Sequence, residues 1–251
     1  MLLKTSGGSA GFCSGVVVAP RAVLTAAHCV TAAGAMRLHY RGPDGAPVLL
    51  PVSRVAVHPE NVPDAKRRHV RTIDMALVEA AAPLPARFAP ATLDNGEPLQ
   101  VGDALTLTGF GLSREGEATS AGTFRAGHIA VRAPLSRILL WANDAPAKGV
   151  GACTGDSGGP IFSRKTGAVV AISAWADGEG KKFCGALTQG VLVAPQREWI
   201  EKTLRGTHAA AWVASLGSRV KNLCRRIFNL RGFQVWFKIM RVSLKPVDIP
   251  K

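Results

Sequence analysis

A serine surrounded by glycines is the strongest candidate nucleophile in this sequence. Residues 155–160 read Gly-Asp-Ser-Gly-Gly-Pro, so Ser157 has small neighbours on both sides. Glycines let the backbone turn sharply, which can expose a serine hydroxyl and leave nearby N–H groups pointing at one spot. The N–H groups of Gly155 and Ser157 are the expected donors to an oxyanion formed by attack on a carbonyl. An ordinary serine in a tight turn is the alternative.

A serine nucleophile needs a base and a group that orients the base. Residues 24–29, Leu-Thr-Ala-Ala-His-Cys, place His28 at the end of an expected strand. Residues 72–77, Thr-Ile-Asp-Met-Ala-Leu, place Asp74 just before an apolar strand. Taken singly, the histidine fits an ordinary core or surface residue, and the aspartate fits a capping or turn residue. Together with Ser157 they form the set of groups that acyl transfer requires.

Short apolar segments separated by Gly, Pro, Asn and Asp must position these groups. A helix is predicted late in the chain, from Pro195 to about Leu216, because proline is favoured in the first turn of a helix. Many short strands and few helical segments predict an all-β sandwich or barrel. The predicted strands cover residues 15–19, 48–57, 104–108, 138–141, 169–174 and 191–193.

The order His28, Asp74, Ser157 and the motifs around these residues resemble the chymotrypsin/trypsin family of serine endopeptidases. The resemblance covers about residues 10–205. It implies an all-β fold of two packed six-stranded antiparallel β-barrels with a C-terminal helix. It also implies peptide hydrolysis through an acyl-enzyme, with the serine as nucleophile, the histidine as general base and the aspartate orienting the histidine. Further matching segments are residues 12–15, 58–59, 109–111, 172–175 and 196–204.

The resemblance divides the chain into a protease domain over residues 1–216 and a basic tail over residues 217–251. Only 12 residues precede Cys13, and the start of most members, an aliphatic residue followed by Val-Gly-Gly, has no counterpart, so we expect a truncated first strand. In those members the freed N-terminus pairs with the aspartate before the nucleophile, here Asp156. We therefore expect Asp156 to be buried without a cation, the loop around Gly155 to swing toward solvent, and the chain to be weakly active. An internal partner for Asp156 is the competing expectation.

Five cysteines allow several pairings, or buried free thiols. The family resemblance implies a Cys13–Cys29 bridge that pins the histidine loop. It also implies a Cys153–Cys184 bridge between the nucleophile loop and the wall of the specificity pocket, which leaves Cys224 unpaired. Disulfides form in oxidising compartments. We therefore expect a secreted or periplasmic protein, although the start of the chain lacks the apolar core of a signal peptide.

Part of the substrate specificity can also be inferred from the family pattern. The base of the primary pocket lies six residues before the nucleophile, which is Gly151, followed by Ala152. A carboxylate there would select Arg or Lys, and its absence predicts an uncharged apolar residue on the acyl side of the cut. Ser173, Trp175 and Gly190 are the expected wall residues.

The positive charge is concentrated at the C-terminal end. Of the 31 Lys and Arg residues nine lie in residues 217–251, with one of the 17 acidic residues, so this tail carries +8 of the net +14. An anionic membrane surface or a polyanion is one expected partner of the tail; a disordered or non-native extension is the other interpretation. We expect a monomer that acts on protein or peptide substrates and needs no metal or cofactor.

Two other functions compete with peptide hydrolysis. Residues 155–159 also fit the G-x-S-x-G nucleophile elbow of α/β-hydrolase esterases. That fold needs a histidine after the serine, and only His208 follows Ser157. The other alternative is a catalytically silent protease fold that serves as a binding protein. All three triad positions are filled, which favours the enzyme.

Overall fold

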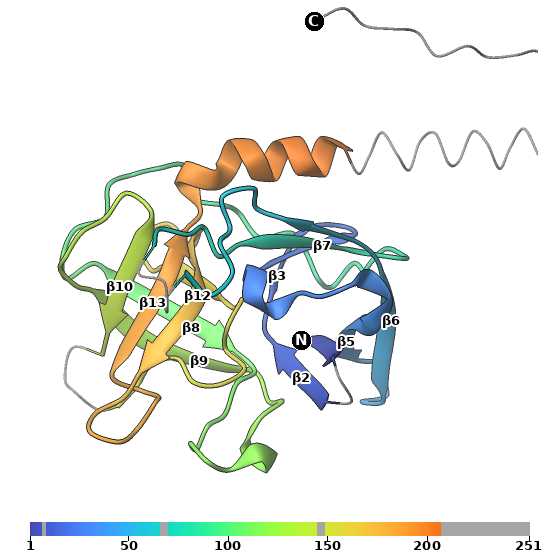
Figure 1. Ribbon diagram of the computed structural model, residues 1–251, viewed down its shortest axis with the longest axis horizontal. Helices are drawn as coiled ribbons and strands as arrows, with labels where there is room; N and C mark the ends of the chain where they lie inside the picture. Colours follow the sequence, from blue (N-terminus) through green and yellow to red (C-terminus); the bar gives the residue numbers. More distant parts are fainter. Residues whose placement is uncertain (7–8, 66–69, 145–148, 207–251) are drawn as a thin grey trace, which may run out of the picture. The chain divides into compact units, whose positions relative to one another are not determined.

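The computed structural model describes residues 1–6, 9–65, 70–144 and 149–206, which form two antiparallel β units from successive halves of the chain (Figure 1). The whole basic tail, residues 217–251, which includes Cys224, lies outside the described residues. The first unit contains β1 (Leu2–Ser6), β2 (Ser9–Cys13), β3 (Val16–Ala19), β4 (Ala22–Thr25), β5 (Met36–Arg41), β6 (Pro47–Val57) and β7 (Ala76–Ala80). The second contains β8 (Ala104–Gly109), β9 (Arg125–Val131), β10 (Leu139–Asn143), β11 (Pro160–Ser163), β12 (Val169–Asp177) and β13 (Leu187–Leu192).

The first unit is a seven-stranded sheet with the order β2-β1-β5-β6-β7-β4-β3. Its two edges, β2 and β3, are consecutive in the chain and separated only by Ser14 and Gly15. Two residues span about 11 Å at most between strand ends, so the edges must lie close together. The sheet therefore differs from the predicted closed six-stranded barrel. At this interruption the N–H of Ser14 donates to the carbonyl of Ser157 in the other unit (2.8 Å).

The second unit is a closed six-stranded barrel with the order β10-β13-β12-β11-β8-β9, as predicted. Its interior is lined by buried aliphatic side chains on alternate positions of the strands, which is the pattern that a closed barrel requires. They include Leu105, Leu107, Ile129, Leu140 and Ile161.

Another cluster of buried side chains joins the two units. Leu24 and Met75, which flank the active-site segments of the first unit, pack with Val169 and Ile172 of β12. Each of these side chains is fully or almost fully removed from solvent. Because close-packed interiors resist displacement, this cluster fixes the segments that carry His28 and Asp74 against the second unit.

The C-terminal helix begins where the sequence predicts it. A 3-10 turn, η4 (Ala194–Gln196), with Pro195 in it, leads into an α-helix whose described part covers residues 197–206 (Figure 1). Ile200 of this helix is buried in the cluster between the two units. Within the described ranges, no helix is long and apolar enough to cross a membrane.

Candidate active site

The His28–Asp74 pair is held by adjacent strands. His28 lies in the 3-10 turn η1 (Ala27–Cys29) just after β4, and Asp74 lies just before β7. Because β4 pairs with β7, and Thr25 faces Ala76, the ladder brings the two segments together. The Oδ2 atom of Asp74 lies 2.6 Å from the ring Nδ1 of His28, and Oδ1 accepts the backbone N–H of His28 at 2.9 Å. A carboxylate at Nδ1 keeps the proton there, so Nε2 is left free to act as a base.

A disulfide lies beside the histidine. The structure contains the predicted Cys13–Cys29 bridge, with an S–S distance of 1.99 Å. A nitrogen of the His28 ring and the two sulfurs lie within 4.8 Å of one another, a spacing that could suggest a metal site. Both sulfurs are already bonded to each other, so neither can serve as the thiolate ligand that zinc requires. The cluster is therefore a covalent brace for the histidine turn.

The nucleophile loop contacts the same segment from the second unit. The carbonyl of Ser157 accepts the N–H of Ser14, and the Sγ atom of Cys29 lies 3.7 Å from that carbonyl. The N–H of Gly158 donates to the carbonyl of Ser173 at 2.6 Å. Among the residues described, no hydrogen bond joins the hydroxyl of Ser157 to the ring of His28. Bonds between nucleophile and base are often long without substrate and tighten when substrate binds.

Two backbone donors next to the nucleophile are unused. In the described part of the chain, neither the N–H of Gly155 nor that of Ser157 donates a hydrogen bond. Gly155 has a φ of +94°, which favours glycine, and a Cβ there would collide with the ring of Phe12. Its carbonyl accepts the hydroxyl of Ser14 at 2.9 Å, which fixes the orientation of this peptide. Both N–H groups are therefore available for an oxyanion.

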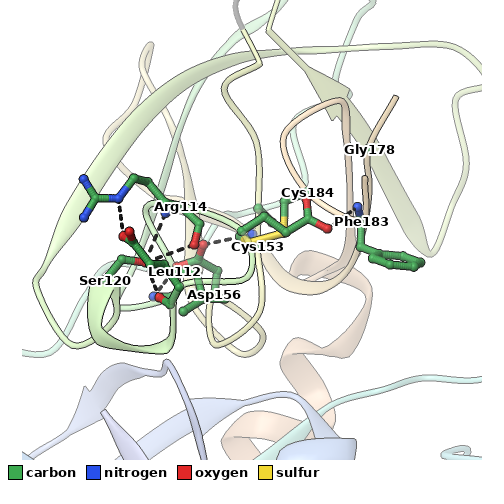
Figure 2. Close-up of a disulfide and its surroundings, with 12 residues drawn as sticks. Leu112, Arg114, Ser120, Cys153, Asp156, Gly178, Phe183 and Cys184 are labelled. Atoms are coloured by element: carbon green, nitrogen blue, oxygen red, sulfur yellow. Dashed lines mark hydrogen bonds and ion pairs between the residues drawn. A yellow bond between two sulfur atoms is a disulfide. The ribbon is translucent and has the colours of Figure 1, made fainter. Parts of the chain in front are cut away.

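Asp156 is buried between these two donors. It is 5% exposed, its Oδ1 accepts the N–H of Gly111 at 2.7 Å, and its Oδ2 accepts the N–H of Cys153 at 3.0 Å. The guanidinium of Arg125 lies 3.7 Å from Oδ2. Burial raises the pKa of this carboxyl, while the two N–H groups and the charge of Arg125 oppose the increase. Figure 2 shows Asp156 beside the predicted Cys153–Cys184 disulfide, which the structure also contains.

The structure contradicts the expected swing of the nucleophile loop. Gly155 and Asp156 are both buried, and Asp156 has partners from within the fold, as the competing expectation holds. The Gly-Phe-Gly segment at residues 109–111 makes this possible. A Cβ on Gly111 would lie 2.5 Å from the Cγ atom of Asp156, and a Cβ on Gly109 would collide with its Oδ1. Two glycines are thus required where the carboxylate packs.

The predicted floor of the primary pocket is small and uncharged. The Cα atom of Gly151 faces Gly185, since a Cβ built on Gly151 would lie 3.0–3.2 Å from the backbone of Gly185. Ala152 is buried, and its N–H donates to the hydroxyl of Thr188 at 2.9 Å. Thr188 is fully buried, and the sequence interpretation missed it because nothing in its local sequence marks it.

The three residues predicted to form the pocket wall have different surroundings in the structure. Trp175 lines a groove of about 1360 Å³ together with His28 and Asp74. Ser173 is buried, and its N–H donates to the carbonyl of Gly159 at 2.8 Å, so its backbone braces the nucleophile loop. Gly190 lies on β13, and a Cβ built on it would lie 3.0–3.1 Å from side chains of Ala171 and Ile161. Its wall role stays a prediction.

Another histidine in the first unit, His58, has a structural role. It is 5% exposed, its Nδ1 accepts the N–H of Glu60 at 3.2 Å, and its ring packs edge-on against Trp199 at 4.8 Å. Burial lowers the pKa of His58, which favours the neutral ring. His58 therefore contributes to anchoring the C-terminal helix.

Comparison with known proteins identifies the family. The family model described as Trypsin matches residues 2–200. The chain belongs to the trypsin family. Kallikrein-15 from Homo sapiens is 30% identical over 217 residues, which cover 77% of this chain and 81% of the relative. Scolexin B from Heliothis virescens is 28% identical over 219 residues, which cover 76% of this chain and 75% of the relative.

Solved structures confirm the fold. Neuropsin, a serine protease expressed in the limbic system of mouse brain, has a TM-score of 0.64 and 22% identity, covering 81% of this chain and 93% of the other. The structure titled GrC has a TM-score of 0.67 and 22% identity, covering 81% and 92%. At this identity the match shows the chymotrypsin-like fold alone. Together with the family match, it places this trypsin-family chain among the serine endopeptidases.

Proposed function

We propose that this trypsin-family chain hydrolyses peptide bonds through an acyl-enzyme, with Ser157 as nucleophile, His28 as general base and Asp74 as its orienting carboxylate. The observation that carries the proposal is the double contact of Asp74 with the ring Nδ1 and the backbone N–H of His28. This arrangement fixes both the tautomer and the direction of the ring. It also stabilises the imidazolium that forms when the histidine takes a proton.

The steps follow from this geometry. The hydroxyl oxygen of Ser157 attacks the carbonyl carbon of the substrate while Nε2 of His28 takes the hydroxyl proton. The carbonyl oxygen becomes an oxyanion, which the unused N–H groups of Gly155 and Ser157 can bind. The intermediate then expels the amine, which receives the proton from His28. Water attacks the remaining ester by the same route and releases the acid and the free serine.

The pocket supports cleavage after an uncharged apolar residue. Around its floor, Gly151 faces Gly185, and Ala152 is bonded to the hydroxyl of Thr188. The carboxylate of Glu115, which lines the same cavity as Gly151, accepts the N–H of Phe183. A buried cation without a counter-charge is costly, and this cost would exclude basic residues. The hydroxyl of Thr188 is buried and accepts the N–H of Ala152, so this side chain adds no charge to the floor.

The two disulfides support a proposal that the protein works in an oxidising compartment, secreted or periplasmic. An esterase of the α/β-hydrolase class has no support in this all-β fold. A catalytically silent binding protein is the remaining alternative. It predicts an undisturbed groove that binds peptides without cleaving them.

Turnover of peptide substrates by the purified chain tests the proposal. Ser157→Ala should lower kcat by about 10⁴-fold or more, because the groups of a triad act as a unit. The control is Ser53→Ala, since Ser53 lies on β6 in the first unit and its exposed hydroxyl donates to the carbonyl of Glu79. Full activity of Ser157→Ala would refute the proposal. Peptide binding without cleavage by the unmodified chain would favour the silent binding protein.

A further inference from the structure

A partly buried cation lies next to the carboxylate of Asp156, the residue between the two oxyanion donors in the sequence. Arg125 is the first residue of β9 and pairs with Gly109 at the end of β8, so the ladder places it beside the Gly-Phe-Gly segment. Its Nη2 donates to the carbonyls of Gly111 (2.5 Å) and Leu112 (2.7 Å) and lies 3.7 Å from Oδ2 of Asp156. The guanidinium of Arg125 thus contacts three groups: the carbonyls of Gly111 and Leu112 and the carboxylate of Asp156.

We propose that Arg125 is a positioning residue that holds Asp156 from within the fold and so keeps the N–H groups of Gly155 and Ser157 directed at the oxyanion. This inference rests on the proposed peptidase function. Its contacts are with the carbonyls of Gly111 and Leu112 and with Asp156, so it acts through the carboxylate of Asp156.

The position of Asp156 controls the nucleophile loop. The backbone N–H of Asp156 donates to the carbonyl of Cys153, and its carbonyl accepts the N–H of Gly159, each at 2.9 Å. The side chain meanwhile accepts from Gly111 and Cys153. If the carboxylate left this pocket, the peptides on both sides of residue 156 would have to rotate. Those peptides carry the N–H groups of Ser157 and of Asp156 itself, so the loop could not keep its arrangement.

Arg125 also connects two loops. Its bonds to the carbonyls of Gly111 and Leu112 fix a segment that contacts the nucleophile loop a second time, because the N–H of Leu112 donates to the carbonyl of Thr154 at 2.9 Å. A lysine would keep the charge but, with a single ammonium, would not present the planar fork of arginine. The chemistry of this corner therefore favours arginine.

Two other charged residues near Asp156, Arg114 and Glu115, have partners elsewhere. A cavity of about 750 Å³ beside Asp156 is lined by Arg125, Arg114, Glu115 and Lys182. Arg114 forms its ion pair with Glu117, and Glu115 accepts the N–H of Phe183 at 2.8 Å (Figure 2). Within the described residues, Arg125 is the cation that both contacts the loop carbonyls and forms an ion pair with Asp156.

The kinetic test compares Arg125→Gln, Arg125→Lys and the matched control Arg114→Gln, a substitution of a cavity arginine that does not contact Asp156. We expect Arg125→Gln to lower kcat about 100- to 1000-fold with KM within about threefold, the loss typical of one oxyanion donor. Arg125→Lys should retain more activity, and the control should match the unmodified chain. Added guanidinium ion should restore part of the activity of an Arg125→Ala variant.

A second test does not depend on activity. Burial raises the pKa of Asp156 above 3.8, so its ionisation opposes folding, and stability is lost as the pH rises through the folded-state pKa. Removing Arg125 raises that pKa further. The difference in Tm between the unmodified chain and Arg125→Gln should therefore be small near pH 3 and grow as the pH rises. In an Asp156→Asn background, Arg125→Gln should produce no such pH dependence.

The outcomes separate the two proposals. If the unmodified chain cleaves peptides and Arg125→Gln keeps its kcat, the role of Arg125 is refuted and the peptidase function stands. If the unmodified chain is inert, the peptidase function fails, and the Tm series still measures the coupling of Arg125 to Asp156. A difference in Tm that is equal at all pH values would refute that coupling.

Discussion

Replacing Gly111 by alanine should displace Asp156 and so remove the oxyanion site. The added Cβ would lie 2.5 Å from Cγ, 2.6 Å from Oδ2 and 2.7 Å from the backbone nitrogen of Asp156. Ordinary contacts begin at 3.4 Å, so the carboxylate must move by about 1 Å. That shift breaks the bonds from Gly111 (2.7 Å) and Cys153 (3.0 Å). Depriving a buried charge of its partners costs about 3–5 kcal/mol of folding free energy.

The same displacement should lower kcat by about 100- to 1000-fold, because losing one oxyanion donor costs roughly 3–4 kcal/mol in the transition state. Steady-state kinetics on a peptide ester and thermal unfolding followed by circular dichroism measure both effects. Gly34→Ala is the matched control, since a Cβ there meets nothing within 4 Å and the backbone is not left-handed. Unchanged kcat and Tm in Gly111→Ala would show that the carboxylate does not organise the site.

Three further predictions test separate features. A peptide-library profile should be led by uncharged apolar residues on the acyl side of the cut; preference for Arg or Lys would contradict the assignment of Gly151 to the pocket floor. Peptide mapping without reduction should recover both disulfides and leave Cys224 as a free thiol; a bridge to Cys224 would contradict this. Burial lowers the pKa of His58 below 6.5, so the stability from its neutral ring is present above pH 6.5 and lost as the pH falls below it. His58→Gln should weaken this dependence of Tm on pH between 7.5 and 5, and an unchanged dependence would oppose the assignment.

Motifs that pack locally could be predicted from the sequence. Three segments could be recognised from the sequence: Ser157 with its glycines, the turn that carries His28 and the segment ahead of Asp74. In each of them the local backbone conformation requires small or apolar neighbours. The register of β4 and β7 then brings the pair together. The late helix was predicted at its start, where Pro195 stands, since proline restrains the backbone there.

Long-range partners could not be predicted in the same way. Arg125 lies 31 positions before Asp156, and Thr188 lies 36 positions after Ala152; only the strand register brings each pair together. The expected swing of the Gly155 loop does not occur, because Asp156 has partners from distant parts of the chain, Gly111 and Arg125.

Covalent labelling of the nucleophile tests the central claim most directly. A serine-directed phosphonylating reagent should modify the purified chain at one residue, and mass spectrometry of its peptides should place the label on Ser157. The same reagent should label His28→Ala at least about 1000-fold more slowly, because the hydroxyl then lacks its base. Label on another serine, or equal labelling of Ser157 in His28→Ala, would contradict the proposed site.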